Sequence, residues 1–306
     1  MKKAVFQHLK PWEKLLIFIS TVMLGIILSI IIRDIAANLL GADISQMDFS
    51  DYSRMDVLRL SKIFLFISHL FTFVLPALVF VKLVSFEPWE FVRLKKPKFN
   101  WLMLLPLLFI TLTILNQLLY GLNRMIDFSF VSDHFQSDLE LQQAVSDKRI
   151  FAFIGGTWKS FFYNLILIAI IPAIGEELTF RGVLQHLFVK GTRNMHVGIF
   201  MSAALFTLIH FQPFNVFPIF ALGLCYGYIA AIMGSLWYTI ILHFMNNALN
   251  VLLMHLQVIY PDYNWDGVSA GIMITFLIVG IAAMIYIVTS KKLKSSWAVT
   301  SGIYMR

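Results

Sequence analysis

The chain has 306 residues, of which 59% are hydrophobic and only 13% are charged, and its net charge is +7. A soluble domain carries about 25% charged residues, so the composition excludes a soluble globular protein and predicts a polytopic membrane protein. The single cysteine, Cys225, excludes a disulfide framework. The sequence has no glycine-rich phosphate loop and no basic patch interleaved with aromatic residues, so no nucleic-acid partner is expected.

Long apolar runs predict an all-α fold, a polytopic transmembrane bundle of about eight spanning helices. The predicted spans cover residues 15–32, 61–84, 101–121, 158–190, 195–211, 215–233, 235–256 and 268–290. The longest polar stretch, 122–157, is expected to hold a short amphipathic helix. At 1.5 Å per residue the fourth helix reaches ~48 Å, so it is expected to tilt, to kink near Pro172 or to break.

The basic residues predict the orientation of these spans. With the N-terminus inside, 16 of the 24 Lys and Arg residues fall on the inner side, and 12 of the 17 acidic residues fall outside. This pattern favours a cell-membrane protein with both termini in the cytoplasm. We expect three regions: 1–157, with three membrane helices and the polar segment 122–157; 158–290, a catalytic helical core with the last span; and a basic cytoplasmic tail, 291–306.

The fourth helix contains two adjacent carboxylates and a guanidinium, in residues 172–181. Each charge costs at least ~2.5–3.5 kcal/mol at bilayer depth, so this group needs either mutual pairing or a chemical role. Arg181 lies four residues after Glu177, on the same helical face, whereas Glu176 points about 100° away. We therefore predict a Glu177–Arg181 pair that leaves Glu176 as a free carboxylate, suited to act as a general base. The alternative is a buried ion pair with a spare Glu near the headgroups.

Three further polar residues come from the charge-free region between Met195 and Tyr260: His210, His243 and Asn247. A turn near Gly191–Asn194 would make the fourth and fifth helices a hairpin, which places His210 and Glu176 at the same depth, ~25 Å from the turn. That pair could activate a water molecule, directly or through a divalent metal.

His243 and Asn247 lie four residues apart on one face of another span, and both could stabilise an oxyanion. Each of these residues is individually also compatible with plain interhelical hydrogen bonding. His69 and His255 are left unassigned for that reason, and His186 is left out because it lies about 80° from the face of Glu176.

The motifs Glu176-Glu177-x-x-x-Arg181, Phe206-x-x-x-His210 and His243-x-x-x-Asn247 resemble the signature of the CAAX prenyl endopeptidase and bacteriocin-processing (CPBP, abortive-infection) family of intramembrane proteases. The resemblance covers about 160–256 and implies a helical-bundle protease. It implies that Glu176 and His210 activate water, that His243 and Asn247 form the oxyanion site, and that Glu177 and Arg181 support them. Glu176, His210 and His243 would suit zinc with an open coordination position, but a metal-free glutamate mechanism would use the same residues.

Three functions compete at this point. The first is an intramembrane endopeptidase, which the resemblance classes as metal-dependent, and its partner is a membrane-embedded or lipidated peptide or protein. The second is a catalytically silent scaffold or bacteriocin-immunity protein of the same fold. The third is a proton-coupled transporter, because intramembrane Glu and His also mark proton relays; the sequence shows no repeated halves, which disfavours it.

Overall fold

A computed structural model describes residues 4–262 together with 275, 278–280, 282 and 285, and within these residues the chain is helical, without strands. The α-helices are α1 (Pro11–Leu39), α2 (Met55–His69), α3 (Leu75–Val84), α4 (Pro88–Phe91), α5 (Phe99–Leu102), α6 (Leu105–Arg124), α7 (Asp133–Ile154), α8 (Trp158–Asn164), α9 (Ile171–Glu177), α10 (Gln185–Thr192), α11 (Met195–His210), α12 (Val216–Met233) and α13 (Trp237–Ile259). The connections hold three short 3₁₀ turns, Ile44–Gln46, Phe128–Phe130 and Pro213–Asn215.

Among the residues that the structure describes, six helical stretches are long and apolar enough to cross a membrane: Pro11–Leu39, Met55–Val84, Phe99–Arg124, Trp158–Thr192, Pro213–Met233 and Trp237–Ile259. The apolar helix Met195–His210 is shorter. These seven stretches coincide with the first seven predicted spans, and they confirm an all-α, multi-pass membrane protein. The eighth predicted span, 268–290, and the tail 291–306 lie outside the described residues apart from a few isolated positions.

The predicted fourth helix runs unbroken from Trp158 to Thr192 and is the most buried of the six candidate spans. The helix does not break at Pro172. It contains two π-helical segments, Leu165–Ile170 before the two glutamates and Leu178–Leu184 after them. A third π-helical segment, Leu70–Val74, joins α2 to α3. Single wide turns of this kind are rare in helices and frequent at functional sites.

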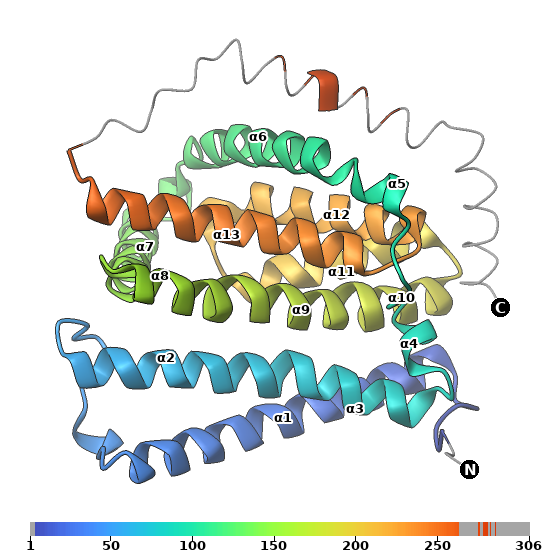
Figure 1. Cartoon of the computed structure of the whole chain (residues 1–306), viewed down its shortest axis with the longest axis horizontal. Coiled ribbons are helices and arrows are strands. Elements are labelled where there is room, and N and C mark those ends of the chain that lie inside the picture. Colours follow the sequence, from blue (N-terminus) through green and yellow to red (C-terminus); the bar gives the residue numbers. More distant parts are fainter. Residues whose placement is uncertain (1–3, 263–274, 276–277, 281, 283–284, 286–306) are drawn as a thin grey trace.

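Figure 1 shows how the helices are layered. The stretch α8–α9–α10 runs through the middle of the bundle, with α2, α3 and α1 on one side and α13, α11 and α12 on the other; α6 covers the outer face of α12 and α13. The central stretch is thus enclosed by protein on both sides, which explains how it can carry charged side chains at membrane depth.

Helix α1 is exposed over most of its surface and carries apolar side chains there, as expected for a helix that faces lipid. Its buried positions include Phe18, Gly25 and Ser29, which share one face because they are seven and four residues apart. A Cβ atom at Gly25 would collide with the backbone carbonyl of Phe71, in the π-helical segment Leu70–Val74. The glycine therefore lets α1 lie directly against the α2–α3 stretch, in the way that small residues allow close packing of membrane helices.

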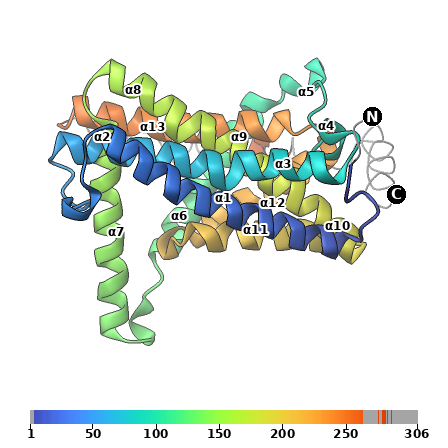
Figure 2. The same cartoon turned by 90° about the horizontal axis from the view of Figure 1, so that it is seen from below.

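Helix α7 projects from the end of the bundle (Figure 2) and contacts α2, α8 and α13 at its base. Its 22 residues make it longer than the short amphipathic helix expected in this segment. Lys62 of α2 donates a hydrogen bond of 2.6 Å to the carbonyl of Phe153, and Asn164 of α8 donates one of 2.8 Å to the same carbonyl. These bonds satisfy the C-terminal end of α7 and fix it against the bundle.

Candidate active site

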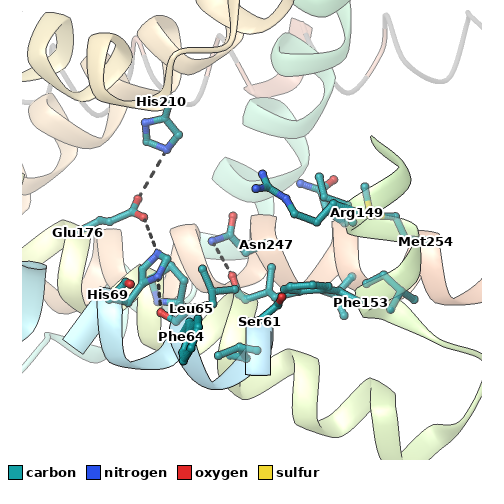
Figure 3. Close-up of a pocket in the computed structure, with 18 of the residues that line it drawn as sticks. Ser61, Phe64, Leu65, His69, Arg149, Phe153, Glu176, His210, Asn247 and Met254 are labelled. Atoms are coloured by element: carbon teal, nitrogen blue, oxygen red, sulfur yellow. Dashed lines mark hydrogen bonds and ion pairs between the residues drawn. The ribbon is translucent and has the colours of Figure 1, made fainter. Parts of the chain in front are cut away.

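The carboxylate of Glu176 lies at the centre of three imidazoles from three other helices. Its side chain is buried, and one oxygen, Oε2, lies 3.9 Å from Nε2 of His210 and 3.8 Å from Nε2 of His243. The other oxygen, Oε1, lies 3.7 Å from Nε2 of His69. Figure 3 shows His210 and His69 approaching Glu176 from opposite sides. All three separations are longer than a direct hydrogen bond and leave room for a bridging atom.

The second nitrogen of each imidazole is held by an acceptor. Nδ1 of His69 lies 3.1 Å from the carbonyl oxygen of Leu65, and Nδ1 of His210 lies 2.7 Å from that of Phe206. Nδ1 of His243 lies 3.0 Å from Oε1 of Glu177. Carbonyl and carboxylate oxygens only accept, so Nδ1 carries the proton in each ring. When these rings are neutral, every Nε2 therefore presents a lone pair toward Glu176.

A carboxylate surrounded by lone pairs is unfavourable unless something positive lies between them. Glu176 and the Nε2 atoms are all acceptors in this state, so they cannot bond to one another. A water molecule that donates to two acceptors, or a cation, satisfies the arrangement. The geometry thus prepares a position for a polarised water, which is what a hydrolytic site requires.

The neighbouring carboxylate, Glu177, is neutralised by Arg181. Nη1 of Arg181 donates to Oε1 of Glu177 at 2.7 Å, and both side chains are fully buried. The guanidinium also lies against the rings of Phe206 and Tyr226, 4.5 and 5.5 Å from their centroids, and donates to the carbonyl of Gly223 at 3.3 Å. The predicted Glu177–Arg181 ion pair is present, and Glu176 is not paired with Arg181.

Asn247 is positioned by a backbone carbonyl that a proline leaves open. Pro172 has no N–H to donate to the carbonyl of Ile168, four residues earlier. The side-chain amide of Asn247 lies 3.4 Å from this carbonyl and donates to it. The amide has two N–H groups, so the second remains available to a group on the pocket side.

These residues line one end of a cavity of about 650 Å³. The lining residues are Arg33, Phe49, Tyr52, Ser61, Phe64, Leu65, Ser68, His69, Arg149, Ile150, Phe153, Ile154, Leu167, Ile168, Pro172, Glu176, His210, Gln212, His243, Asn247, Asn250, Val251 and Met254. In Figure 3, Glu176 with its imidazoles lies at one end, Asn247 in the middle, and Arg149, Phe153 and Met254 at the other end. The walls are largely apolar with a few convergent polar groups, as in substrate pockets of enzymes.

Comparison with known families agrees with this geometry. Residues 158–249 match the family model described as type II CAAX prenyl endopeptidase Rce1-like. This segment is an Rce1-like domain. The match confirms the family that the three motifs indicate, and it supports protease activity of the CAAX type. No curated protein and no solved structure matches the chain.

The Rce1-like domain supplies Glu176, His210, His243 and Asn247, all predicted from the sequence, and the structure brings the first three together. The hairpin argument holds because α10 and α11 are joined by a tight turn in which Arg193 takes a left-handed conformation. His210 consequently meets Glu176 across one helix pair. Asn247 lines the same cavity one helical turn after His243.

His69 lies outside the Rce1-like domain, and motif analysis gave it no role. Its position follows from the packing of α2 against α9, which no motif in the first half of the chain indicates. The available signal in the sequence was a polar residue in an apolar span, seven residues before Pro76. His255, the other unassigned histidine, is bound to the carbonyl of Gly155 at 3.1 Å and packs on Trp158, away from Glu176.

The site offers the donor types of a zinc centre, namely one carboxylate and imidazole nitrogens in the ligating tautomer. In the part of the chain that the structure describes, however, no group of three or more His, Cys, Asp or Glu side chains has the spacing of an assembled metal site. The donor chemistry therefore suits zinc, while the spacing does not form a closed ligand set. Zinc binding by Glu176, His210 and His243 stays a prediction.

Loss of Arg181 should destabilise the Rce1-like domain far more than loss of a surface arginine. Arg181→Ala leaves the buried carboxylate of Glu177 without its cation, which costs about 3–5 kcal/mol for a buried pair. Arg54→Ala is the matched control, because Arg54 pairs with Asp56 at 2.6 Å on the exposed surface, where screening by solvent makes such a pair contribute little to stability. Thermal unfolding of the two purified variants in detergent measures the loss of stability that each substitution causes. Equal midpoints for the two variants would contradict the role given to the buried pair.

Proposed function

We propose that the protein is an intramembrane endopeptidase that hydrolyses a peptide bond of a membrane-associated peptide or protein, one that is prenylated or carries a hydrophobic tail. The observation that carries the proposal is the buried carboxylate of Glu176 with Nε2 of three imidazoles 3.7–3.9 Å from its oxygens, at one end of a cavity of about 650 Å³. The family match supports the reaction class. The assignment of residues to steps is our own.

In the proposed first step, Glu176 removes a proton from a water molecule that it shares with His210. Nε2 of His210 accepts a hydrogen bond from the second O–H of this water and so fixes the orientation of the water. The ring of His210 is itself held by the bond between Nδ1 and the carbonyl of Phe206. The water oxygen then attacks the carbonyl carbon of the scissile peptide bond. A carboxylate in this role contributes roughly 10²–10⁴-fold to the rate.

His243 and Asn247 stabilise, by hydrogen bonds, the negative charge that develops on the carbonyl oxygen. His243 donates from Nε2 when both of its ring nitrogens carry a proton, with Nδ1–H on Oε1 of Glu177. Asn247 donates the amide N–H that is not bound to Ile168. The tetrahedral intermediate then collapses: the C–N bond breaks, Glu176 returns its proton to the leaving amine, and the products are a carboxylic acid and an amine.

A zinc ion held by Glu176, His210 and His243 would supply Lewis-acid activation of the same water. The surroundings also favour a hydrophobic substrate, because the helices that line the cavity are exposed to lipid on their outer faces. We further propose a cell-membrane location with both termini in the cytoplasm, on the distribution of the basic residues. In that orientation the segment between α1 and α2, which contributes Phe49 and Tyr52 to the cavity lining, lies on the side away from the cytoplasm.

Glu176→Gln tests the proposal directly. With a fluorogenic peptide that carries a hydrophobic tail, the purified variant should lose roughly 10²–10⁴-fold in turnover, because the amide cannot take a proton from water. Glu87→Gln, an exposed glutamate outside the cavity, is the matched control and should cleave as the wild type does. The same assay with a chelator, followed by zinc, reports on the metal. Cleavage by neither wild type nor variant, over a panel of membrane-presented peptides, favours the scaffold or transporter instead.

His69 should contribute to turnover although it lies outside the Rce1-like domain. We expect His69→Gln to lower kcat by about ten- to hundredfold with little change in KM, since it removes one of the three imidazole nitrogens that surround the carboxylate of Glu176. His255→Gln is the matched control, because His255 is also buried with Nδ1 on a backbone carbonyl but contacts no carboxylate. If the two variants lose kcat equally, His69 has only a packing role.

A further inference from the structure

Three polar side chains that line the cavity have no part in the proposed chemistry. Ser61 and Ser68 lie on α2, seven residues apart and therefore on one face of that helix, and Asn250 lies on α13. In Figure 3, Ser61 lies between His69, at the reacting end, and Phe153, at the other end. Helices α2 and α13 flank the central α8–α9 stretch on opposite sides, so the three groups belong to two walls of the cavity.

The hydrogen-bonding groups of these side chains are available. None of the three side chains makes a hydrogen bond with another residue that the structure describes. Hydroxyls in membrane helices often donate to a carbonyl one turn earlier, as that of Thr111 does to the carbonyl of Leu107 at 2.8 Å. The hydroxyls of Ser61 and Ser68 make no such bond, so they can bond to a group in the cavity. Asn250 is exposed and offers both a donor and an acceptor.

The spacing of these groups matches an extended peptide. Along α2, Ser61 lies eight residues before His69, which corresponds to about 12 Å; along α13, Asn250 lies seven residues after His243, about 10.5 Å. The two helices run in opposite directions (Figure 1), so both groups lie at a similar distance from the reacting end. An extended chain advances about 3.3 Å per residue, so this distance corresponds to about three or four residues. Ser68, next to His69, lies close to the reacting end itself.

An extended peptide at membrane depth needs groups of this kind. Its backbone N–H and C=O groups lose the bonds that they make to water or within a helix, and the hydrocarbon core offers no replacement. A serine hydroxyl or an asparagine amide can bond to either backbone group. The apolar lining residues beside them, such as Leu65 and Val251, cannot. The polar side chains on the two walls therefore suit a peptide main chain, whatever its side chains are.

We propose that Ser61, Ser68 and Asn250 bind the main chain of the substrate and hold it extended over the three or four residues on one side of the scissile bond. Main-chain hydrogen bonds give affinity in other sites that bind extended peptides. The inference rests on the proposed endopeptidase activity, since it places the scissile bond at Glu176. It adds that this stretch of the substrate is recognised by its backbone.

Substrate chemistry tests this without any variant. Wild type is given fluorogenic peptides that each carry one ester in place of a backbone amide, from the second to the sixth amide on either side of the scissile bond. An ester keeps the shape of the chain but has no N–H to donate. On one side, an ester at the third or fourth position should lower kcat/KM by about two- to tenfold, mainly through KM, because one hydrogen bond is lost.

Esters at the sixth position serve as matched controls, because they lie beyond the three side chains, and they should be cleaved as the all-amide peptide is. Equal kcat/KM for every peptide of the series overturns this inference and leaves the endopeptidase intact; it is also the result expected if water alone bonds to these side chains. No cleavage of any peptide overturns both the inference and the proposed function.

Variants then assign the effect to residues. In Ser61→Ala and Asn250→Leu the ratio of amide to ester kcat/KM should fall toward one, because the bond is already missing. Ser20→Ala is the matched control and should keep the wild-type ratio, since Ser20 does not line the cavity and donates to the carbonyl of Leu16 at 2.9 Å. A readout independent of turnover is the affinity of a Glu176→Gln background for amide and ester peptides, with and without Asn250→Leu. An amide preference that survives replacement of both Ser61 and Asn250 contradicts the assignment.

Discussion

The buried ion pair between Glu177 and Arg181 determines the state of everything around it. Because Arg181 donates to Glu177 and not to Glu176, it distinguishes two chemically identical neighbouring side chains: one is paired with a cation, and the other faces the imidazoles. The same pair holds the ring of His243 through Nδ1 and thereby turns its other nitrogen toward Glu176. Without this pair, two adjacent carboxylates in the middle of a membrane bundle would be expected to protonate or to move apart.

The backbone of the central helix contributes as much as its side chains. Wide π-helical turns lie before and after the two glutamates, and a proline between the first turn and Glu176 leaves open a carbonyl that receives Asn247. The π-helical segment Leu70–Val74, which follows His69, also contacts the central helix: the carbonyl of Phe73 accepts a hydrogen bond of 3.0 Å from the hydroxyl of Thr179. Irregular backbone is tolerated at membrane depth here because neighbouring helices satisfy the carbonyls that it exposes.

The part of this site that could be predicted from sequence was local or related by a single turn. The Glu177–Arg181 pair follows from the spacing of four residues, and the meeting of Glu176 with His210 follows from equal distances to one hairpin turn. His69, Ser61 and Ser68 could not be predicted in this way. They belong to a helix whose placement depends on tertiary packing, such as the contact that Gly25 permits between α1 and the α2–α3 stretch, and no spacing rule links that helix to the Rce1-like domain.

The fold, like the site, divides into local features that the sequence predicts and tertiary features that it does not. Apolar runs predicted seven helical stretches, including one over residues 158–190, because length and hydropathy are local properties. The π-helical segments within that long helix were not predicted, and the bond from Asn247 of α13 to the carbonyl of Ile168 is a tertiary contact that no local pattern indicates. The length of α7 was likewise underestimated, because most of that helix is polar and its C-terminal end is fixed by Lys62 and Asn164 from other helices.

The central claim is that Glu176 and the three Nε2 atoms surround a shared position for a water or a cation. A high-resolution experimental structure of the protein in a lipid environment tests it most directly. The claim predicts density between the side chains, within bonding distance of Glu176 and of at least two of the nitrogens of His69, His210 and His243. Direct contact between the carboxylate and the imidazoles, with no atom between them, or an imidazole of residue 210 or 243 turned toward lipid, would contradict it.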